Sequence, residues 1–141
     1  MLSTAGSLIP DELNRDLSTL AERGFEYQVR EEGPRVYVLF ANYPLPSDVY
    51  YLGGMSVDTT RLLIFTTQFY PNAGFDMFWV EEGLTLKGGG IPKNADVIET
   101  YLGQQWRRFS YHPYNNRPWN PSEDNVVSFM ANVDHRLGRG D

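Results

Sequence analysis

The amino-acid sequence predicts an α+β domain with a helix, a run of antiparallel strands, an irregular segment and a second helix. Apolar residues recur at helical spacing near both ends of the chain, and short β-branched or aromatic segments fill its middle. The chain has 141 residues, of which 41% are hydrophobic and 21% charged, a length and composition typical of one globular domain. We therefore expect residues 1–141 to fold as a single domain.

The first predicted helix begins near Pro10. Proline suits the first turn of a helix, where its missing N–H leaves no bond unmade, and Asp11 suits the positive helix start. Gly24 provides the helix end. The apolar stripe at helical spacing comprises Ile9, Leu13, Leu17 and Leu20. Such a stripe packs one helix face against a core.

Four strands are expected next. Each candidate is a short segment rich in β-branched or aromatic residues, and turn residues such as Gly33-Pro34 separate the segments. The segments are 25–29, 36–40, 62–65 and 75–80. Because they follow one another along the chain, we expect an antiparallel meander.

Residues 81–105 break this pattern. They include Gly88-Gly89-Gly90 and Pro92 and show little alternation, so we expect an irregular segment here. Long irregular segments of compact domains are usually functional or mobile. A final helix should follow, with Ser122 as its N-cap and Gly138 at its end. Its apolar stripe comprises Val126, Phe129, Met130, Val133 and Leu137.

Composition argues against several kinds of chemistry. Twelve basic and eighteen acidic residues give a net charge of −6, which disfavours a nucleic-acid or anionic-membrane partner. The chain has no Cys, so it cannot form a disulfide, a thiolate nucleophile or a Cys-ligated metal site. His112 and His135 are too few and too far apart in sequence to predict a metal centre. Gly88-Gly89-Gly90 lacks the Lys-Ser/Thr pair of a phosphate-binding loop, and no cofactor is expected.

No segment suggests a membrane span or an export signal. The sequence has no run of about 18 apolar residues. Residues 1–10 have neither a basic start nor an apolar stretch of signal-peptide length. We therefore expect a cytoplasmic protein.

The side chains with the most chemical potential lie between Trp106 and Pro113. In an extended segment every second side chain shares a face. That face would hold Trp106, Arg108, Ser110 and His112. A Ser hydroxyl needs a base within hydrogen-bond reach to act as a nucleophile, and His112 is the natural candidate beside Ser110. Arg108 or its neighbour Arg107 could stabilise a carboxylate or a developing oxyanion, whereas composition alone favours a strand end with His112 packed on aromatic rings.

Five tyrosines near predicted turns leave two interpretations open. They are Tyr43, Tyr50, Tyr51, Tyr111 and Tyr114. Tyrosine is favoured at protein interfaces, but these side chains could equally cover a small core.

Several motifs, taken in order, match those of a known superfamily. Tyr70-Pro71 precedes the aromatic segment 75–79, the segment 101–112 follows, and Trp119-Asn120-Pro121 stands just before the final helix. With these motifs the chain resembles the ubiquitin-conjugating enzyme (UBC) superfamily over residues 9–137, and more narrowly its bacterial family E branch. The resemblance implies a UBC-like fold in which the irregular segment carries the active site.

The resemblance also implies where a catalytic residue would stand. Counting back from Trp119 puts the position of the superfamily's catalytic Cys at Tyr111, between Ser110 and His112. The chain has no Cys and lacks the superfamily's His-Pro-Asn motif upstream of this position. A thioester mechanism is therefore not implied. The candidate catalytic residues are Ser110, His112, Arg108 and Tyr111.

The functional hypotheses follow from these partners and residues. Such bacterial proteins are encoded beside an activating-enzyme homologue, a ubiquitin-like protein and often a JAB-type peptidase, so the resemblance implies a role in ubiquitin-like protein conjugation. The first hypothesis is an active enzyme that works through an oxyester on Ser110, or that uses His112 to assist direct transfer from the activating enzyme. The second is a catalytically inactive adaptor that binds the ubiquitin-like protein or its activating enzyme. The third is an unrelated α+β domain.

Overall fold

The computed structural model describes residues 9–141. The expected absence of an export signal concerns residues 1–10, most of which lie outside this range. Within it, no helix is long and apolar enough to cross a membrane. The elements are α1 (Asp11–Glu22), β1 (Tyr27–Glu32), β2 (Arg35–Pro44), β3 (Tyr50–Leu52), β4 (Met55–Ser56), β5 (Thr59–Thr67), β6 (Phe78–Glu81), β7 (Thr85–Leu86), β8 (Val97–Tyr101), β9 (Gln104–Phe109) and α2 (Val126–Gly138).

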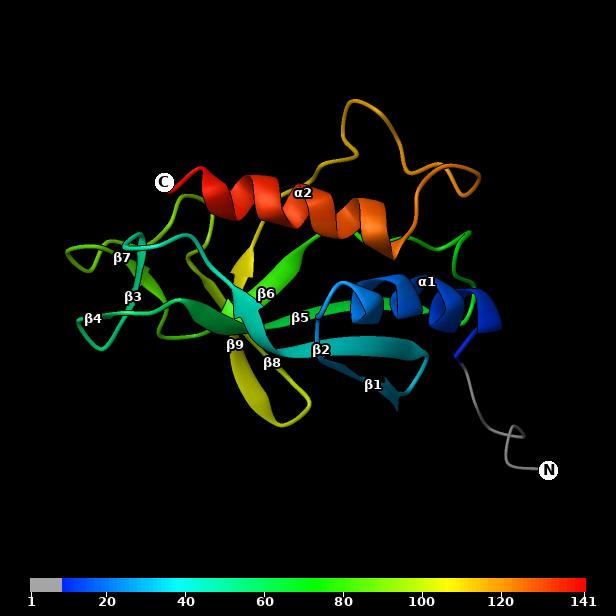
Figure 1. Cartoon of the computed structure of the whole chain (residues 1–141), viewed down its shortest axis with the longest axis horizontal. Helices are drawn as coiled ribbons and strands as arrows, with labels where there is room; N and C mark the ends of the chain where they lie inside the picture. Colours follow the sequence, from blue (N-terminus) through cyan, green and yellow to red (C-terminus); the bar gives the residue numbers. More distant parts are fainter. Residues whose placement is uncertain (1–8) are drawn as a thin grey trace.

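The strands form two antiparallel sheets. Six strands pair in the order β1-β2-β5-β6-β9-β8, and three short strands pair in the order β4-β3-β7. Both helices pack on the same face of the six-stranded sheet (Figure 1). The predicted α+β class is thus confirmed, and the four expected strands correspond to β1, β2, β5 and β6. The last of these begins at Phe78 rather than at Phe75.

The expectation that residues 81–105 are irregular holds for residues 87–96 but is wrong for much of the rest. The segment contains β7 and β8, and β8 forms a hairpin with β9 that widens the main sheet. Leu102 and Gly103 make the two-residue turn of this hairpin, with φ angles of 53° and 73°. Positive angles suit a tight turn between twisted strands but are unusual for leucine. Leu102 packs against buried aromatic residues on the outer face of the sheet, and this contact offsets the strain of its backbone.

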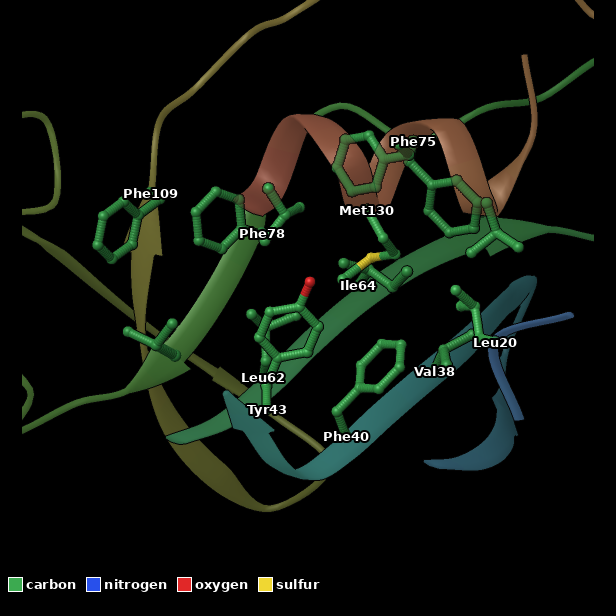
Figure 2. Close-up of a cluster of buried hydrophobic side chains, with 14 of the residues drawn as sticks. Leu20, Val38, Phe40, Tyr43, Leu62, Ile64, Phe75, Phe78, Phe109 and Met130 are labelled. Atoms are coloured by element: carbon green, nitrogen blue, oxygen red, sulfur yellow. The ribbon is translucent and has the colours of Figure 1, made fainter. Parts of the chain in front are cut away.

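The main core lies between the helices and the facing side of the sheet. Figure 2 shows Phe40 of β2, Ile64 of β5 and Met130 of α2 in this core. A bulge in β2 between Phe40 and Tyr43 lets both side chains point to the same face despite their odd spacing. Tyr43 and Tyr50 are 1% and 0% exposed, so these two tyrosines belong to the core and not to an interface.

A second group of buried side chains, the outer aromatic cluster, covers the opposite face of the sheet. It comprises Tyr37, Leu63, Trp79 and Trp106, with Phe65 and Tyr101 among the residues packed against them. The rings of Tyr37 on β2 and Tyr101 on β8 lie 6.0 Å apart, although four strand steps of about 4.8 Å separate these strands along the sheet. The sheet therefore curls, and in Figure 1 the β8–β9 hairpin passes beneath β2. The Arg35 guanidinium closes the cluster, 4.2 Å from the centre of the Phe65 ring.

Helix α2 begins later than expected. Its N-cap is Asn125, not Ser122, because Asn125 and Ser128 form reciprocal bonds. The Asn125 side chain accepts from the Ser128 N–H at 3.0 Å, and the Ser128 hydroxyl accepts from the Asn125 N–H at 3.0 Å. Ser122 instead lies in the turn before the helix, where its N–H donates to the Asn120 side chain.

Candidate functional site

The candidate site lies where β9 ends. Phe109 is fully buried in the main core, and the next residue, Ser110, leaves the sheet. The Ser110 N–H donates to the carbonyl of Asn94 at 2.9 Å. Because the strand stops at Phe109, the alternation expected of an extended segment does not continue to His112.

The turn 92–95 fixes the position of Ser110. Three consecutive carbonyls of this turn each accept one hydrogen bond. The pairs are Lys93 O with Arg136 Nη2 at 2.8 Å, Asn94 O with the Ser110 N–H at 2.9 Å, and Ala95 O with Arg107 Nη1 at 2.7 Å. Both arginines are buried, and burial lowers the pKa of each guanidinium below its ordinary value. Arginine still stays charged in proteins, so two fixed positive charges stand behind the end of the strand.

Arg108 and Ser110 point to the same side of the strand end. Arg108 Nε donates to the Ser110 hydroxyl oxygen at 3.1 Å, and Arg108 Nη1 donates to Glu99 at 3.3 Å. Glu99 also accepts from the Trp79 indole N–H at 2.9 Å, which ties the arginine to the outer aromatic cluster. The Ser110 hydroxyl thus lies beside a fixed cation, an arrangement that suits developing negative charge.

His112 pairs with Asp76 and not with Ser110. The imidazole Nδ1 lies 2.8 Å from Asp76 Oδ2. Because an ionised carboxylate only accepts hydrogen bonds, Nδ1 carries the proton in this pair, and Nε2 of the neutral ring keeps its lone pair. No hydrogen bond joins His112 to Ser110 within residues 9–141. The His112 and Asp76 side chains are 38% and 57% exposed, so a second molecule can reach the pair.

Asp76 is the residue that the sequence did not single out. It lies 36 residues from His112, within a segment expected to be a strand. The chain before Phe78 is a loop, which leaves Asp76 at the surface. The available signal was a carboxylate inside an otherwise apolar segment. Tyr111, the other candidate, is half-buried against the main core.

A cleft of about 460 Å³ opens beside the His112–Asp76 pair. Asp76 lies on its wall together with Tyr114 and Trp119. The Trp119 indole N–H donates to the carbonyl of Pro71 at 2.7 Å, and its ring covers Gly74. A Cβ atom on Gly74 would lie 2.2 Å from that ring. Only glycine therefore lets the indole pack on this loop and form the wall of the cleft.

A buried carboxylate organises the chain between the site and α2. Asp124 is 5% exposed and accepts two hydrogen bonds from Arg117, both at 2.9 Å, and one from the Asn120 N–H at 2.8 Å. The Arg117 bonds are the main cause that lowers the pKa of Asp124 below its ordinary value. The loop between β9 and α2 is thus fixed at one end by the turn 92–95 and at the other by Asp124.

One family of known proteins matches nearly the whole chain. The matched residues are 12–140, and the family is described as prokaryotic E2 family E. The match includes the six-stranded sheet, helix α2 and the site around Ser110, His112 and Asp76. No curated protein and no solved structure matches the chain significantly.

Proposed function

The chain belongs to prokaryotic E2 family E, and from this membership we propose that it is a Cys-free transferase of ubiquitin-like protein conjugation with His112 as its general base. Membership of the family means that the protein is E2-like and acts in a conjugation pathway. The His112–Asp76 pair supports the role of His112 as general base, because it leaves an exposed imidazole nitrogen beside a cleft. The proposed partners are a ubiquitin-like protein and its activating enzyme, with a JAB-type peptidase in the same pathway.

The proposed step transfers an acyl group from the activating enzyme to an amine. The ubiquitin-like protein is held through its C-terminal carboxyl as a thioester on a Cys of that enzyme. A neutral amine attacks the thioester carbon, the C–N bond forms, and the C–S bond breaks with its electron pair on the thiolate. His112 Nε2 takes the proton from the attacking nitrogen, and Asp76 stabilises the imidazolium that forms. A positioned general base contributes about 10²–10⁴-fold to a rate.

An oxyester on Ser110 is the other catalytic route, and the geometry supports it less. Ser110 has Arg108 beside it but no base in hydrogen-bond contact among residues 9–141. To serve Ser110, His112 would have to give up its bond to Asp76. We therefore expect Ser110 to be dispensable for transfer.

A discharge assay tests the proposal. The neighbouring activating enzyme is charged with the ubiquitin-like protein, separated from ATP, and mixed with this protein and free lysine as the acceptor. We expect wild type and Ser110→Ala to accelerate loss of the thioester equally, and His112→Gln to reduce the acceleration by about 100-fold or more. Equal acceleration by wild type and His112→Gln would overturn the proposal.

Intact-mass spectrometry of the same reactions separates the two catalytic routes. His-assisted transfer leaves no oxyester on this protein. An adduct that withstands thiol reductant, is cleaved by hydroxylamine and disappears in Ser110→Ala would replace the His-assisted mechanism by the oxyester route.

A catalytically inactive adaptor is the second candidate function. The observation that favours it is the absence of Cys, together with a half-buried Tyr111 at the position where the superfamily carries its nucleophile. Such an adaptor binds the ubiquitin-like protein or the charged activating enzyme without changing the rate of thioester loss. Binding measured by isothermal titration calorimetry, combined with an unchanged discharge rate, would identify it.

A further inference from the structure

Lysine is scarce in this chain. Ten of the twelve basic residues are Arg, and only Lys87 and Lys93 carry a primary amine on a side chain. An isopeptide bond needs such an amine, whereas the guanidinium of Arg stays charged in proteins and does not serve. Apart from its amino terminus, the protein therefore offers two nitrogen acceptors of its own for acyl transfer.

Lys87 is a poor acceptor. Its ammonium donates to the Asp48 carboxylate at 3.1 Å, and the same carboxylate accepts from the Tyr51 hydroxyl. The bond to Asp48 raises the pKa of Lys87, which favours the protonated, non-nucleophilic form. Lys87 also follows β7 in the small sheet, whereas the candidate site lies at the end of β9.

Lys93 makes no such bond. It is exposed, and its Nζ makes no hydrogen bond or ion pair within residues 9–141, although Asp141 is near enough to interact with it electrostatically. Its side chain projects from the turn 92–95, whose carbonyls are held by Arg136, Ser110 and Arg107. The backbone under this amine is therefore fixed, while the amine moves on a flexible four-carbon stem.

The turn brings this amine near the proposed reaction centre. The neighbouring Asn94 carbonyl accepts from the Ser110 N–H, so the Cα atoms of Lys93 and Ser110 lie within roughly 9 Å of each other. Ser110 and His112 are two residues apart, and their Cα atoms are separated by at most about 7 Å. An extended lysine side chain covers roughly 6 Å of this path. A thioester carbon placed between the Lys93 amine and the His112 imidazole is therefore within reach of both side chains.

We propose that Lys93 is a self-modification site, where the protein accepts the C-terminus of the ubiquitin-like protein as an isopeptide. The inference rests on the proposed function, since His112 is the base in both. The Lys93 ammonium first loses one proton to solvent, and the neutral amine attacks the thioester carbon on the activating enzyme. The C–N bond forms, the second proton passes to His112 Nε2, and the C–S bond breaks with its electron pair on the thiolate.

Intact-mass spectrometry with peptide mapping tests the proposal on the full chain. After incubation with the activating enzyme, the ubiquitin-like protein and ATP, we expect an adduct that withstands both thiol reductant and hydroxylamine and that maps to Lys93. Lys93→Arg keeps the positive charge but removes the acceptor, so the adduct should fall at least tenfold. The matched control, Lys87→Arg, should leave the adduct unchanged, and His112→Gln should reduce it as strongly as Lys93→Arg.

Discharge to free lysine separates this inference from the proposed function. An undiminished adduct in Lys93→Arg, or an adduct that maps to Lys87 or to the amino terminus, would overturn the assignment of Lys93. His112-dependent discharge to free lysine would then still support the proposed function. If wild type gives neither discharge nor adduct, the proposed function and the inference fail together.

Discussion

Two carboxylates beside the loop between β9 and α2, those of Asp124 and Asp76, differ in their burial and in their hydrogen bonds. Asp124 is buried and accepts four hydrogen bonds, two from Arg117, one from the Asn120 N–H and a long one from the Ser128 hydroxyl. Asp76 is more than half exposed, and within residues 9–141 its carboxylate makes one bond, to the imidazole of His112. The buried carboxylate holds the chain that leads into α2, whereas the exposed one orients a single titratable ring at the edge of a cleft.

This difference separates a structural pair from a chemical one. Removing a buried acceptor leaves polar groups without partners, which costs more than the bonds themselves contribute. An exposed pair contributes little to stability because water replaces either partner. The same exposure lets His112 exchange a proton with a bound molecule, which a buried pair cannot do. We therefore expect Asp124 to govern stability and Asp76 to govern transfer.

The largest expected effect comes from removing the buried carboxylate. Asp124→Ala should lower the free energy of unfolding by about 3 kcal/mol, because it removes four bonds and leaves the Asn120 N–H without its acceptor. Asp76→Ala should change it by less than about 0.5 kcal/mol. Urea denaturation of the two variants measures the contrast, and equal losses would remove the distinction between the pairs.

Gly74→Ala should have the next largest effect, because it disturbs the packing of Trp119 on the loop that contains Gly74. The new methyl group would lie 2.2 Å from the Trp119 ring, so the indole must move and loses its bond to Pro71. Overpacking of this kind costs about 2 kcal/mol. The matched control is Gly90→Ala, where an added Cβ meets nothing within 4 Å. Thermal unfolding of both variants tests the contrast, and a Gly74→Ala protein as stable as wild type would mean that the indole has room to shift.

Much of this fold could be predicted from local sequence pattern. Both helices and the strands around Val38 and Ile64 form where the sequence indicates them, because each helix buries one regular apolar face and each strand is a short apolar segment buried on both faces of the sheet. The β8–β9 hairpin was not predicted because, in β8, a charged residue is partly buried and an apolar residue is exposed. Glu99 is half-buried, satisfied by Trp79 and Arg108, while Ile98 is 40% exposed. Its turn uses Leu102 at positive φ, where Asn or Gly is the usual sign of a hairpin.

The contacts of the candidate site also differ in whether local sequence could predict them. Arg108 and Ser110 are close in sequence and adjacent on a strand end, so their contact follows from the two-residue repeat of an extended chain. The contact between Asp76 and His112 joins residues 36 apart and exists only because β6 and β9 pair in the sheet. No spacing rule within the sequence indicates such a contact. The exposed Asp76–His112 pair, which suggests catalysis, could therefore be recognised only from the fold.

A smaller effect, on rate and not on stability, should follow Asp76→Asn. The amide keeps the shape of the carboxylate but loses the charge that stabilises imidazolium as His112 takes a proton. Discharge to free lysine should slow roughly tenfold, equivalent to about 1.4 kcal/mol, while the free energy of unfolding stays within about 0.5 kcal/mol of wild type. The exposed Asp58, changed to Asn, is the control and should leave both quantities unaltered. A normal rate in Asp76→Asn would show that His112 needs no carboxylate.

The smallest expected effect is a difference in acid sensitivity between wild type and Asp124→Asn. Arg117 holds the pKa of Asp124 below its ordinary value of 3.8, so between the two values the unfolded chain binds more protons than the folded one. The stabilisation from this ionised carboxylate is present above about pH 4 and is lost as the pH falls through the lowered pKa. Wild type should therefore lose more unfolding free energy than Asp124→Asn between about pH 6 and pH 3. The lowered pKa values of Asp48 and Asp141 affect both proteins alike and cancel in this comparison. Urea denaturation at each pH measures the difference, and parallel losses in the two proteins would mean that Asp124 stabilises the loop through its shape and not through its charge.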